Sequence, residues 1–569
     1  MQITKTPDVD VPAPRILPKD FDPSDASAIE AQARELLDRP LAGVVDWTTW
    51  IYDWGQLGSF ISGGYSRCRI AFDRKTDDTA AGEALRAFRT EALPVWERLD
   101  DELNRRFLGS PVLDELDGEL DVLVRDRKRS RDLYRAENIE LISEDRRIVA
   151  EWKKLVGGAL VEIDGKKCTQ AEAQTRLSDP DREVRKSTFL AISDKRSTLR
   201  EGVDDLLDEV LEVRAQAARN AGFENFRDFA HAHQMRFDYT PDDCVEFQKA
   251  VETVVVPAVR DLETTRREAM ELDTLRPWDA AMNPWARSPE PLFQPGDDYI
   301  RFVRSLFDAV DPSFARDFDI LIRNGLIDVV ARPAKSPGGY NSMIGDIRLP
   351  FIFGNTAGDP SDLRFLLHEG GHAFHSLAAR NQRVARYMHA PAEFCEVASM
   401  AMEHFGIERL ERLCGEEHAA PIVRHHFEQA IRMLPRIAHV DAFQHFIFTT
   451  DHTRDERRAK WAELASRFTP DIDWSGVEWA RDDQWQAIPH LFSHPMYYIA
   501  YGIAQLGALQ VWRASREDFA AAIAAYRRAL DLGGSRPLPQ LFEAAGARLS
   551  MDESTFREIV AAVMERVGE

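Results

Sequence analysis

The sequence predicts a mostly helical protein with one small β patch. Apolar residues recur at spacings of three and four over long stretches, for example 79–107 and 114–149, which is the pattern of an amphipathic helix. The least helical stretch is confined to residues 328–355. The chain has 569 residues, of which 44% are hydrophobic, and this is sufficient for one large core or for two lobes.

The N-terminal part is expected to be helical from residue 25 to about residue 154, after an extended arm over residues 1–25. Trp47, Trp50 and Trp54 follow one another at helical spacing. Because large aromatic side chains at this spacing usually pack in a core, we expect them there rather than around a ligand.

The segment 160–168 interrupts the helical pattern. Val161, Ile163 and the pair Asp164-Gly165 predict a short β-hairpin with a tight turn. Helices are expected again over residues 170–220, with a stop at Ala221-Gly222, and over residues 241–271.

A change in composition marks residues 273–298, where prolines alternate with tryptophans, and we interpret this stretch as a structured connector. A helix is expected over residues 299–310. The strongest strand signal in the chain is Arg348–Phe353, just before a helical segment. If this strand has an exposed edge, it could bind an extended peptide through main-chain hydrogen bonds. The alternative is a simple core strand.

The helix expected after residue 359 carries the pattern His-Glu-x-x-His at His368, Glu369 and His372. Asp359 and Pro360 give a helix start. Histidines four residues apart lie one turn apart on one face, so both imidazoles can bind a single zinc ion, while the glutamate can address a zinc-bound water. A paired glycine, Gly370-Gly371, suggests that another group approaches this helix closely.

A catalytic zinc site needs a third protein ligand, because three ligands and one open position are typical. The next acidic helix supplies Glu393, Glu396 and Glu403. Glu396 has apolar neighbours on both sides and is the expected ligand, with Glu393 as its rival. Glu403 lies two turns beyond Glu396 and could accept the free ring N–H of a ligand histidine, or simply be solvated.

Hydrolysis of an amide also requires hydrogen-bond donors for the negative charge that develops on the carbonyl oxygen. The segment 488–502 contains His490 and His494, and three of the chain's eleven tyrosines, Tyr497, Tyr498 and Tyr501. The pair Tyr498 and Tyr501 is three residues apart and could share a helix face. Amphipathic packing of these rings is the alternative.

Composition excludes some partners and favours one compartment. The net charge of −23 argues against binding to nucleic acid, and no stretch is apolar over the length that a membrane span needs. Five scattered cysteines, without a Cys-x-x-Cys pair, indicate free thiols. Because the N-terminus also lacks a secretory signal, we expect a cytoplasmic protein. The oligomeric state is open, with a monomer as the expectation.

These residues together resemble the thimet oligopeptidase and oligoendopeptidase F family of zinc metallopeptidases. The shared segments are His368–His375, Glu396–Ser399, His490–Tyr501, the turn at Pro337, the strand at Pro350, and Gly533–Pro537. The resemblance is strongest over residues 330–540. Gly370 departs from it, since relatives usually carry a large apolar residue there.

The resemblance implies a two-lobed helical metallopeptidase with a deep central channel and the small β patch beside the zinc helix. It divides the chain into a helical N-terminal oligopeptidase region (1–168) and a catalytic region (169–569). His368, His372 and Glu396 would bind one Zn²⁺ per chain, and Glu369 would be the general base. His490, Tyr498 and Tyr501 would stabilise the oxyanion, with Tyr497 as an alternative.

The implied activity is hydrolysis of internal peptide bonds in short unfolded peptides, through Glu-assisted attack of zinc-bound water. Two alternatives remain on the same residues. One is a zinc exopeptidase or other amide hydrolase, and the other is a peptide-binding relative without catalysis. Manganese or cobalt could also occupy a His/His/Glu site.

Overall fold

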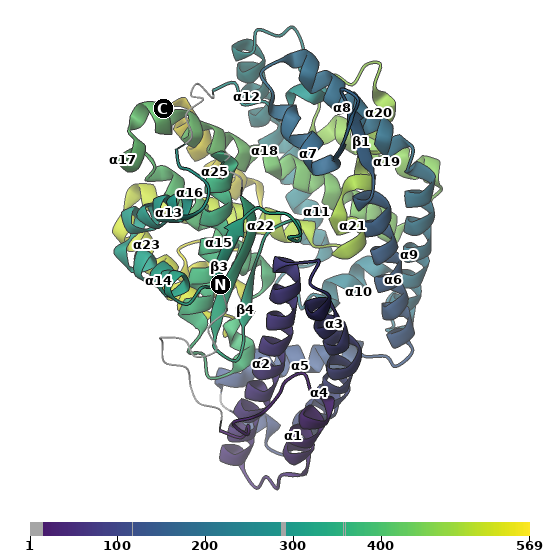
Figure 1. Ribbon diagram of the computed structural model, residues 1–569, viewed down its shortest axis with the longest axis vertical. Coiled ribbons are helices and arrows are strands. Elements are labelled where there is room, and N and C mark those ends of the chain that lie inside the picture. The colour runs from purple at the N-terminus through teal and green to yellow at the C-terminus, as the bar shows by residue number, and fades with distance from the viewer. Residues whose placement is uncertain (1–14, 117, 286–291, 357, 359) are drawn as a thin grey trace. The chain divides into compact units, whose positions relative to one another are not determined.

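The computed structural model describes residues 15–116, 118–285, 292–356, 358 and 360–569, and Figure 1 traces their helices and strands. The chain divides into two compact units that alternate along the sequence. The first unit comprises residues 1–131, 288–419 and 507–549, and the second comprises residues 132–287, 420–506 and 550–569. The predicted mostly helical fold is confirmed. The division at residue 168 stays a prediction.

The first unit combines helices with a small sheet. Its helices are α1 (Ala26–Asp38), α2 (Val44–Arg74), α3 (Thr79–Ala87), α4 (Leu93–Leu108), α13 (Asp297–Val310), α14 (Pro312–Arg323), α15 (Pro360–Ala379), α16 (Ala392–Glu408), α17 (Glu411–Cys414), α23 (Phe519–Leu532) and α24 (Leu538–Ala544). Its strands are β3 (Ile327–Val330), β4 (Tyr340–Ile344) and β5 (Leu349–Thr356).

The second unit is built from helices and one hairpin. Its helices are α6 (Asn138–Gly157), α7 (Gln170–Thr175), α8 (Arg182–Ser197), α9 (Arg200–Asn220), α10 (Phe226–His233), α11 (Pro241–Ala250), α12 (Val256–Ala269), α19 (Arg454–Phe468), α20 (Glu478–Asp482), α21 (Pro489–Ser493) and α25 (Glu553–Gly568). The hairpin pairs β1 (Leu160–Ile163) with β2 (Lys166–Thr169). Helices α5 (Asp121–Leu133), α18 (Glu416–Thr449) and α22 (Tyr498–Glu517) belong partly to each unit.

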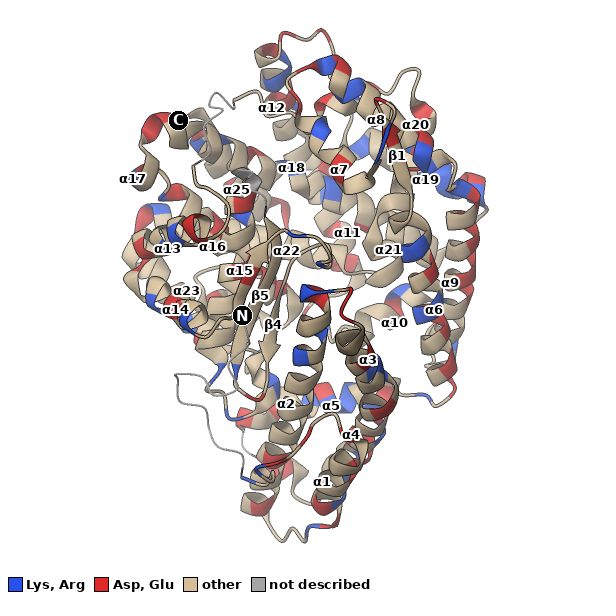
Figure 2. Cartoon of the chain, viewed as in Figure 1, with Lys and Arg blue, Asp and Glu red and all other residues tan. Residues whose placement is uncertain are grey.

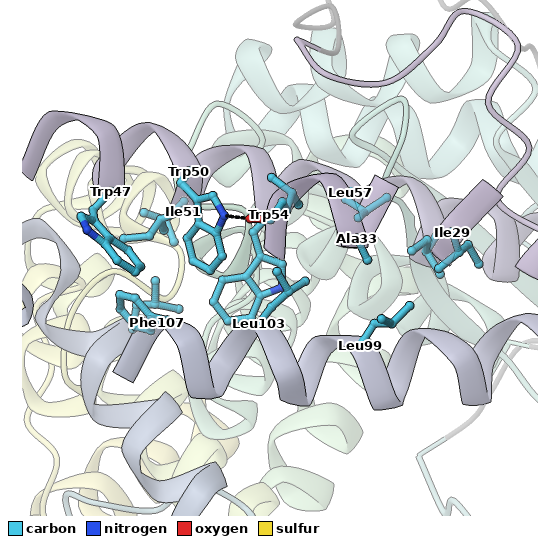
Figure 3. Packing of buried hydrophobic residues seen from close by; sticks show 14 of the residues in the cluster. Ile29, Ala33, Trp47, Trp50, Ile51, Trp54, Leu57, Leu99, Leu103 and Phe107 are labelled. Atoms are coloured by element: carbon cyan, nitrogen blue, oxygen red, sulfur yellow. Dashed lines mark hydrogen bonds between the residues drawn. The ribbon is translucent and has the colours of Figure 1, made fainter. Parts of the chain in front are cut away.

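The N-terminal helices of the first unit enclose a hydrophobic core. Trp47, Trp50 and Trp54 of α2 are buried there against residues of α1 and α4, as Figure 3 shows. The indole of Trp50 donates a hydrogen bond of 2.8 Å to the carbonyl oxygen of Leu36, which satisfies its only polar group. The three tryptophans are therefore core residues, as the sequence predicts.

Two predictions for the segment 114–169 have different outcomes. The predicted hairpin forms, with positive φ angles of 53° at Asp164 and 73° at Gly165 in its turn. The helix expected over 114–149 is instead interrupted, because α5 ends at Leu133 and α6 begins at Asn138. At this break the guanidinium of Arg135 donates to the carbonyl oxygens of Asp132 and Tyr134, as is common where a helix ends. The extended arm predicted before residue 25 falls, over residues 1–14, outside the described residues.

The sheet of the first unit has the order β3-β5-β4, with β3 parallel and β4 antiparallel to β5. The strand predicted at Arg348–Phe353 is therefore the central strand β5, hydrogen-bonded on both sides and almost entirely buried. It has no free edge for a peptide, so the core-strand alternative is correct for this segment.

The sheet positions the helix that carries the metal motif. The ring of Phe365 in α15 lies against the backbone of Gly339 and of Gly354, where a Cβ atom would be only 2.2 and 2.4 Å away. Only glycine allows this approach, so the two glycines fix α15 beside β5. Figure 1 shows α15 running next to the strands.

Charge is mixed along the helices. Figure 2 shows acidic and basic residues interspersed on α6, α9 and α19 of the second unit. Within the described part of the chain, none of the helices has both the length and the apolar character needed to cross a bilayer.

Candidate metal centre and active site

Helices α15 and α16 bring three potential metal ligands together. His368, His372 and Glu396 place one nitrogen or oxygen atom each within 4.8 Å of one another. The Glu396 carboxylate oxygen Oε2 lies 3.5 Å from Nε2 of His368 and 3.7 Å from Nε2 of His372. The two imidazoles are nearly perpendicular, with ring centroids 4.8 Å apart. Among the described residues, Glu393 joins no such group, although it is also buried.

Close packing of α15 on α16 produces this convergence. A Cβ atom at Gly371 would lie 2.6 Å from the carbonyl oxygen of Ala398 and 2.6 Å from the Cα of Ser399. The α16 backbone therefore occupies the space of a side chain at position 371. At the neighbouring Gly370, the ring of Phe307 from α13 fills the position of a side chain, because a Cβ atom there would lie only 2.4 Å from the ring. The paired glycine thus admits a helix on one side and an aromatic ring on the other.

A second carboxylate supports the first histidine. Glu403, also in α16, places Oε1 2.6 Å from Nδ1 of His368, so the Nε2 atom of His368 is left to face Glu396. Burial lowers the pKa of His368, but the hydrogen bond and charge of Glu403 outweigh it and raise that pKa to about 9. Glu403 is 4% exposed and is therefore not a solvated surface residue.

Glu369 lies in the same buried environment. Its side chain is 6% exposed, and its Oε2 atom has no hydrogen-bond partner among the described residues. Burial, together with the negative charges of Glu396 and Glu403, raises the pKa of Glu369 to about 7. A carboxylate in this condition can take up and release a proton near neutral pH.

The second unit brings His490 together with three tyrosines. The ring of His490 in α21 lies with its centroid 4.9 Å from that of Tyr498 and 5.7 Å from that of Tyr501. The hydroxyl of Tyr501 is 3.4 Å from Nε2 of His490. Tyr497 stacks on the same imidazole at 6.2 Å. Tyr498 and Tyr501 both lie in the first turn of α22, as their spacing predicts.

Distant side chains hold α21 and the loop between α21 and α22. Met496 has a left-handed backbone with φ of 60°, and its N–H donates to Oε1 of Gln444 at 2.6 Å. Gln234 donates to the carbonyl oxygen of Pro495 at 2.8 Å, and Arg214 donates to that of Leu491 at 2.8 Å. No sequence pattern indicates these residues, because each lies more than fifty positions from its partner and belongs to no motif.

The fold and the ligand group define a class of helical metallopeptidases with a His-Glu-x-x-His helix and a glutamate on the following helix. The chain belongs to peptidase family M3, whose model matches residues 175–291 and 296–560, more than half of the sequence. No curated protein matches the chain significantly.

Solved structures agree with this assignment. A PZ peptidase A solved with an inhibitor is 26% identical, with a TM-score of 0.88 over 96% of this chain and 98% of that one. A protein assigned as oligoendopeptidase F is 27% identical, with a TM-score of 0.88 over 98% and 99% of the two chains. A Bacillus anthracis structure shares the fold at 22% identity, with a TM-score of 0.84 over 98% and 99%. The protein is a metalloendopeptidase of this family.

Proposed function

We propose that the chain is a zinc-dependent oligoendopeptidase that hydrolyses internal bonds of short unfolded peptides. The observation that carries the proposal is the convergence of His368, His372 and Glu396 beside the buried carboxylate of Glu369. Two imidazoles and one carboxylate form a ligand set used by catalytic zinc sites, and a carboxylate at this place is a suitable proton carrier.

Two of the three distances between donor atoms are close to those of a zinc site. Two tetrahedral ligand bonds of the usual zinc length place their donor atoms ~3.3 Å apart. The distances of 3.5 and 3.7 Å between Glu396 Oε2 and the two histidine nitrogens are close to this value. Zinc would supply Lewis acidity toward the substrate carbonyl and toward water.

Glu369 would carry the proton in this reaction. Its carboxylate takes a proton from the attacking water and delivers it to the leaving amine, which accounts for both transfers with one residue. The raised pKa of about 7, caused by burial and by the neighbouring carboxylates, matches this double role. Glu403 would orient His368 by accepting its Nδ1–H, because the 2.6 Å contact fixes which ring nitrogen faces the ion.

His490, Tyr498 and Tyr501 are the proposed donors to the developing oxyanion. Burial, with a smaller contribution from His494, lowers the pKa of His490 to about 4, so its imidazole is neutral at pH 7. A neutral imidazole still donates one N–H, and the phenol groups donate an O–H each. Tyr497, which touches the same ring, remains an alternative donor.

The partners we propose are short peptides, which agrees with the peptidase family and with the neighbours solved as oligoendopeptidases. All five cysteines are free thiols, and this favours a reducing compartment such as the cytoplasm. A monomer remains our proposal for the assembly.

The deciding experiment uses a quenched peptide of about ten residues, the length that an extended binding site could hold, with both ends blocked. We expect internal cleavage by the zinc-loaded enzyme, and loss of cleavage after chelation and in Glu369→Gln, which should retain zinc. Glu396→Ala should lower zinc content more than Glu393→Ala, its matched control in the same helix.

Other outcomes would redirect the assignment. Cleavage only of peptides with a free end would favour an exopeptidase, and turnover of acylated amines would favour another amide hydrolase. Peptide binding at full zinc occupancy without turnover would favour a non-catalytic relative. A Glu369→Gln variant that keeps most of its activity would remove Glu369 from the role of base.

A further inference from the structure

A cavity of about 330 Å³ lies in the second unit, formed by α12, α18, α19 and the segment that follows α19. All of the residues that line it belong to this unit, and none of them is a proposed metal ligand, base or oxyanion donor. Its volume is at the lower end of the range found for small-molecule sites. The inference drawn from it is independent of the proposed peptidase chemistry.

The walls of the cavity are largely apolar and aromatic. Trp461, Phe468, Trp474 and Met433 line it. His439 packs against Trp461 in a tilted arrangement with ring centroids 3.8 Å apart, and its Nε2 atom lies 3.2 Å from the carbonyl oxygen of Trp461. The indole of Trp461 is therefore held in a fixed orientation. These walls suit the apolar body of a ligand.

Two hydrogen-bond donors of the cavity residues have no acceptor. The indole nitrogens Nε1 of Trp461 and Trp474 are buried and have no partner among the described residues. Trp461 is 3% exposed as a whole. These nitrogens have almost no accessible surface, so the two tryptophans contribute apolar ring atoms rather than hydrogen-bond donors to the surface of the cavity.

The charges around the cavity leave an excess of positive charge. Glu263 pairs with Arg432 at 2.6 Å, and Asp471 pairs with Arg260 at 3.1 Å, so the acidic lining residues are neutralised. The guanidinium of Arg436 lines the cavity, is exposed, and has no carboxylate partner among the described residues.

A second cation lies near Arg436. Arg196 of α8 donates to the amide oxygen of Gln170 at 3.3 Å and has no acidic partner in the described chain. Burial, and then the charge of Arg436, lower the pKa of Arg196. Arg196 does not line the cavity, so its charge adds only to the positive field around Arg436, which favours an anion there.

We propose that this cavity binds a small amphipathic carboxylate, with its aromatic or branched body between the tryptophan and phenylalanine walls. The carboxylate of the ligand pairs with the exposed guanidinium of Arg436. Such chemistry is found in a free aryl acid and in the C-terminal residue of a peptide, and the two sources can be separated experimentally.

The test measures binding to the zinc-loaded, full-length protein by calorimetry. The probes are 3-phenylpropionate, for a free aryl acid, and N-acetylphenylalanine, for a peptide terminus. N-acetylphenylalaninamide differs from the second probe only in its carboxylate. We expect at least one acid to bind, and the amide to bind at least tenfold more weakly than N-acetylphenylalanine if the terminus is the ligand. If only 3-phenylpropionate binds, the ligand is a free aryl acid.

Variants then locate the site. Arg436→Gln should weaken binding of the acid at least tenfold, and Val259→Trp, which fills the cavity from α12, should abolish it. Arg267→Gln on the same helix, which lies outside the lining, is the matched control and should bind like the wild type. In protein labelled with 5-fluorotryptophan, the acid should shift the fluorine resonances assigned to Trp461 and Trp474 by their replacement with phenylalanine.

The proposal is overturned by several results. It fails if neither acid binds at millimolar concentration, or if Arg436→Gln leaves the affinity unchanged. It also fails if chelation of the metal abolishes binding, because the acid then occupies the metal centre. If the wild-type protein had no peptidase activity, the proposed function would be refuted. The binding experiment would still test the cavity, because it does not depend on turnover.

Discussion

Nδ1 of His368 lies 2.6 Å from Oε1 of Glu403, although the two residues are thirty-five positions apart and on different helices. The contact uses one ring nitrogen, so that the other, Nε2, faces Glu396 at 3.5 Å. Glu403 thus controls the orientation of one proposed ligand without belonging to the ligand group itself.

Glu403→Ala is expected to weaken zinc binding about 10- to 100-fold, as found when a carboxylate that orients a ligand histidine is removed. Competition with a chelating dye measures this affinity. Glu411→Gln removes an exposed charge from the neighbouring helix α17 and should leave the zinc affinity unchanged. Equal affinities in Glu403→Ala and wild type would mean that His368 does not need this partner.

Gly371→Ala is expected to lower the free energy of unfolding by about 1–3 kcal/mol, the usual cost of overpacking a tight contact. The new Cβ would lie 2.6 Å from two backbone atoms of α16, so the helices must separate. Because the proposed ligands lie on both helices, zinc affinity should fall as well. Urea unfolding of the metal-free protein and zinc competition measure the two effects.

The matched control for this change is Gly157→Ala at the end of α6, where nothing lies within 4 Å of the new Cβ. Replacing a helical glycine by alanine removes backbone freedom from the unfolded chain and should be neutral or stabilising by up to about 1 kcal/mol. If both variants were equally stable, the close approach of α15 and α16 would not be what requires glycine.

The group of potential metal ligands could be predicted from sequence because most of the motif lies within a few consecutive residues. His368, Glu369 and His372 lie within five residues, and helical geometry alone places both imidazoles on one side. The choice of Glu396 over Glu393 needed the burial pattern of a second helix, and the structure places Glu396 beside both histidines. The Trp47, Trp50 and Trp54 core was likewise visible as helical spacing.

Contacts between residues that are far apart in the chain could not be predicted in the same way. The central position of β5 depends on its parallel pairing with β3, which is separated from it in sequence by β4, so local spacing could not distinguish a central strand from an edge. The contact of Gln444 with Met496 depends on a left-handed backbone at a methionine, which no residue preference predicts.

Gln444→Met is expected to reduce kcat about tenfold or more while zinc content stays at the wild-type level. The substitution keeps the size of the side chain but removes the acceptor of the Met496 N–H, so the loop that positions His490 and the tyrosines loses its anchor. Misplacement of a catalytic group by about 1 Å can cost about 100-fold in rate. Steady-state kinetics with the quenched peptide measure kcat and KM separately.

Gln510→Met provides the comparison. Gln510 is another buried glutamine with two backbone hydrogen bonds of 3.0 Å, both to Arg548, and it supports no proposed catalytic residue. The Gln510→Met substitution should lower the free energy of unfolding without lowering kcat. If Gln444→Met and Gln510→Met affected kcat equally, the loop anchor would have no specific role in catalysis.

Asp328 gives a prediction for acid stability. Its carboxylate accepts hydrogen bonds from Arg74 at 2.7 Å, from Arg332 at 2.6 Å and from Lys335 at 2.9 Å. Burial raises its pKa, but these three cations outweigh burial and hold the pKa of Asp328 well below its usual value. The folded state therefore binds a proton here less readily than the unfolded state does.

The sign follows from linkage between folding and protonation. The stabilisation by Asp328 is fully present above pH 4, the ordinary range of an aspartate, and is lost progressively as the pH falls toward the lower pKa of the folded state. Asp328→Asn, which leaves three cations without their anion, should cost about 3 kcal/mol at pH 7. That difference from the wild type should shrink between pH 4 and pH 2.

Urea unfolding of the metal-free proteins at several pH values measures the difference without interference from the metal ligands. Asp164→Asn serves as the control, because Asp164 is a largely exposed partner of Arg176 in the β1–β2 turn. Its effect should be below about 1 kcal/mol, as for other surface ion pairs. A constant difference between Asp328→Asn and wild type down to pH 2 would show that another group controls the acid sensitivity.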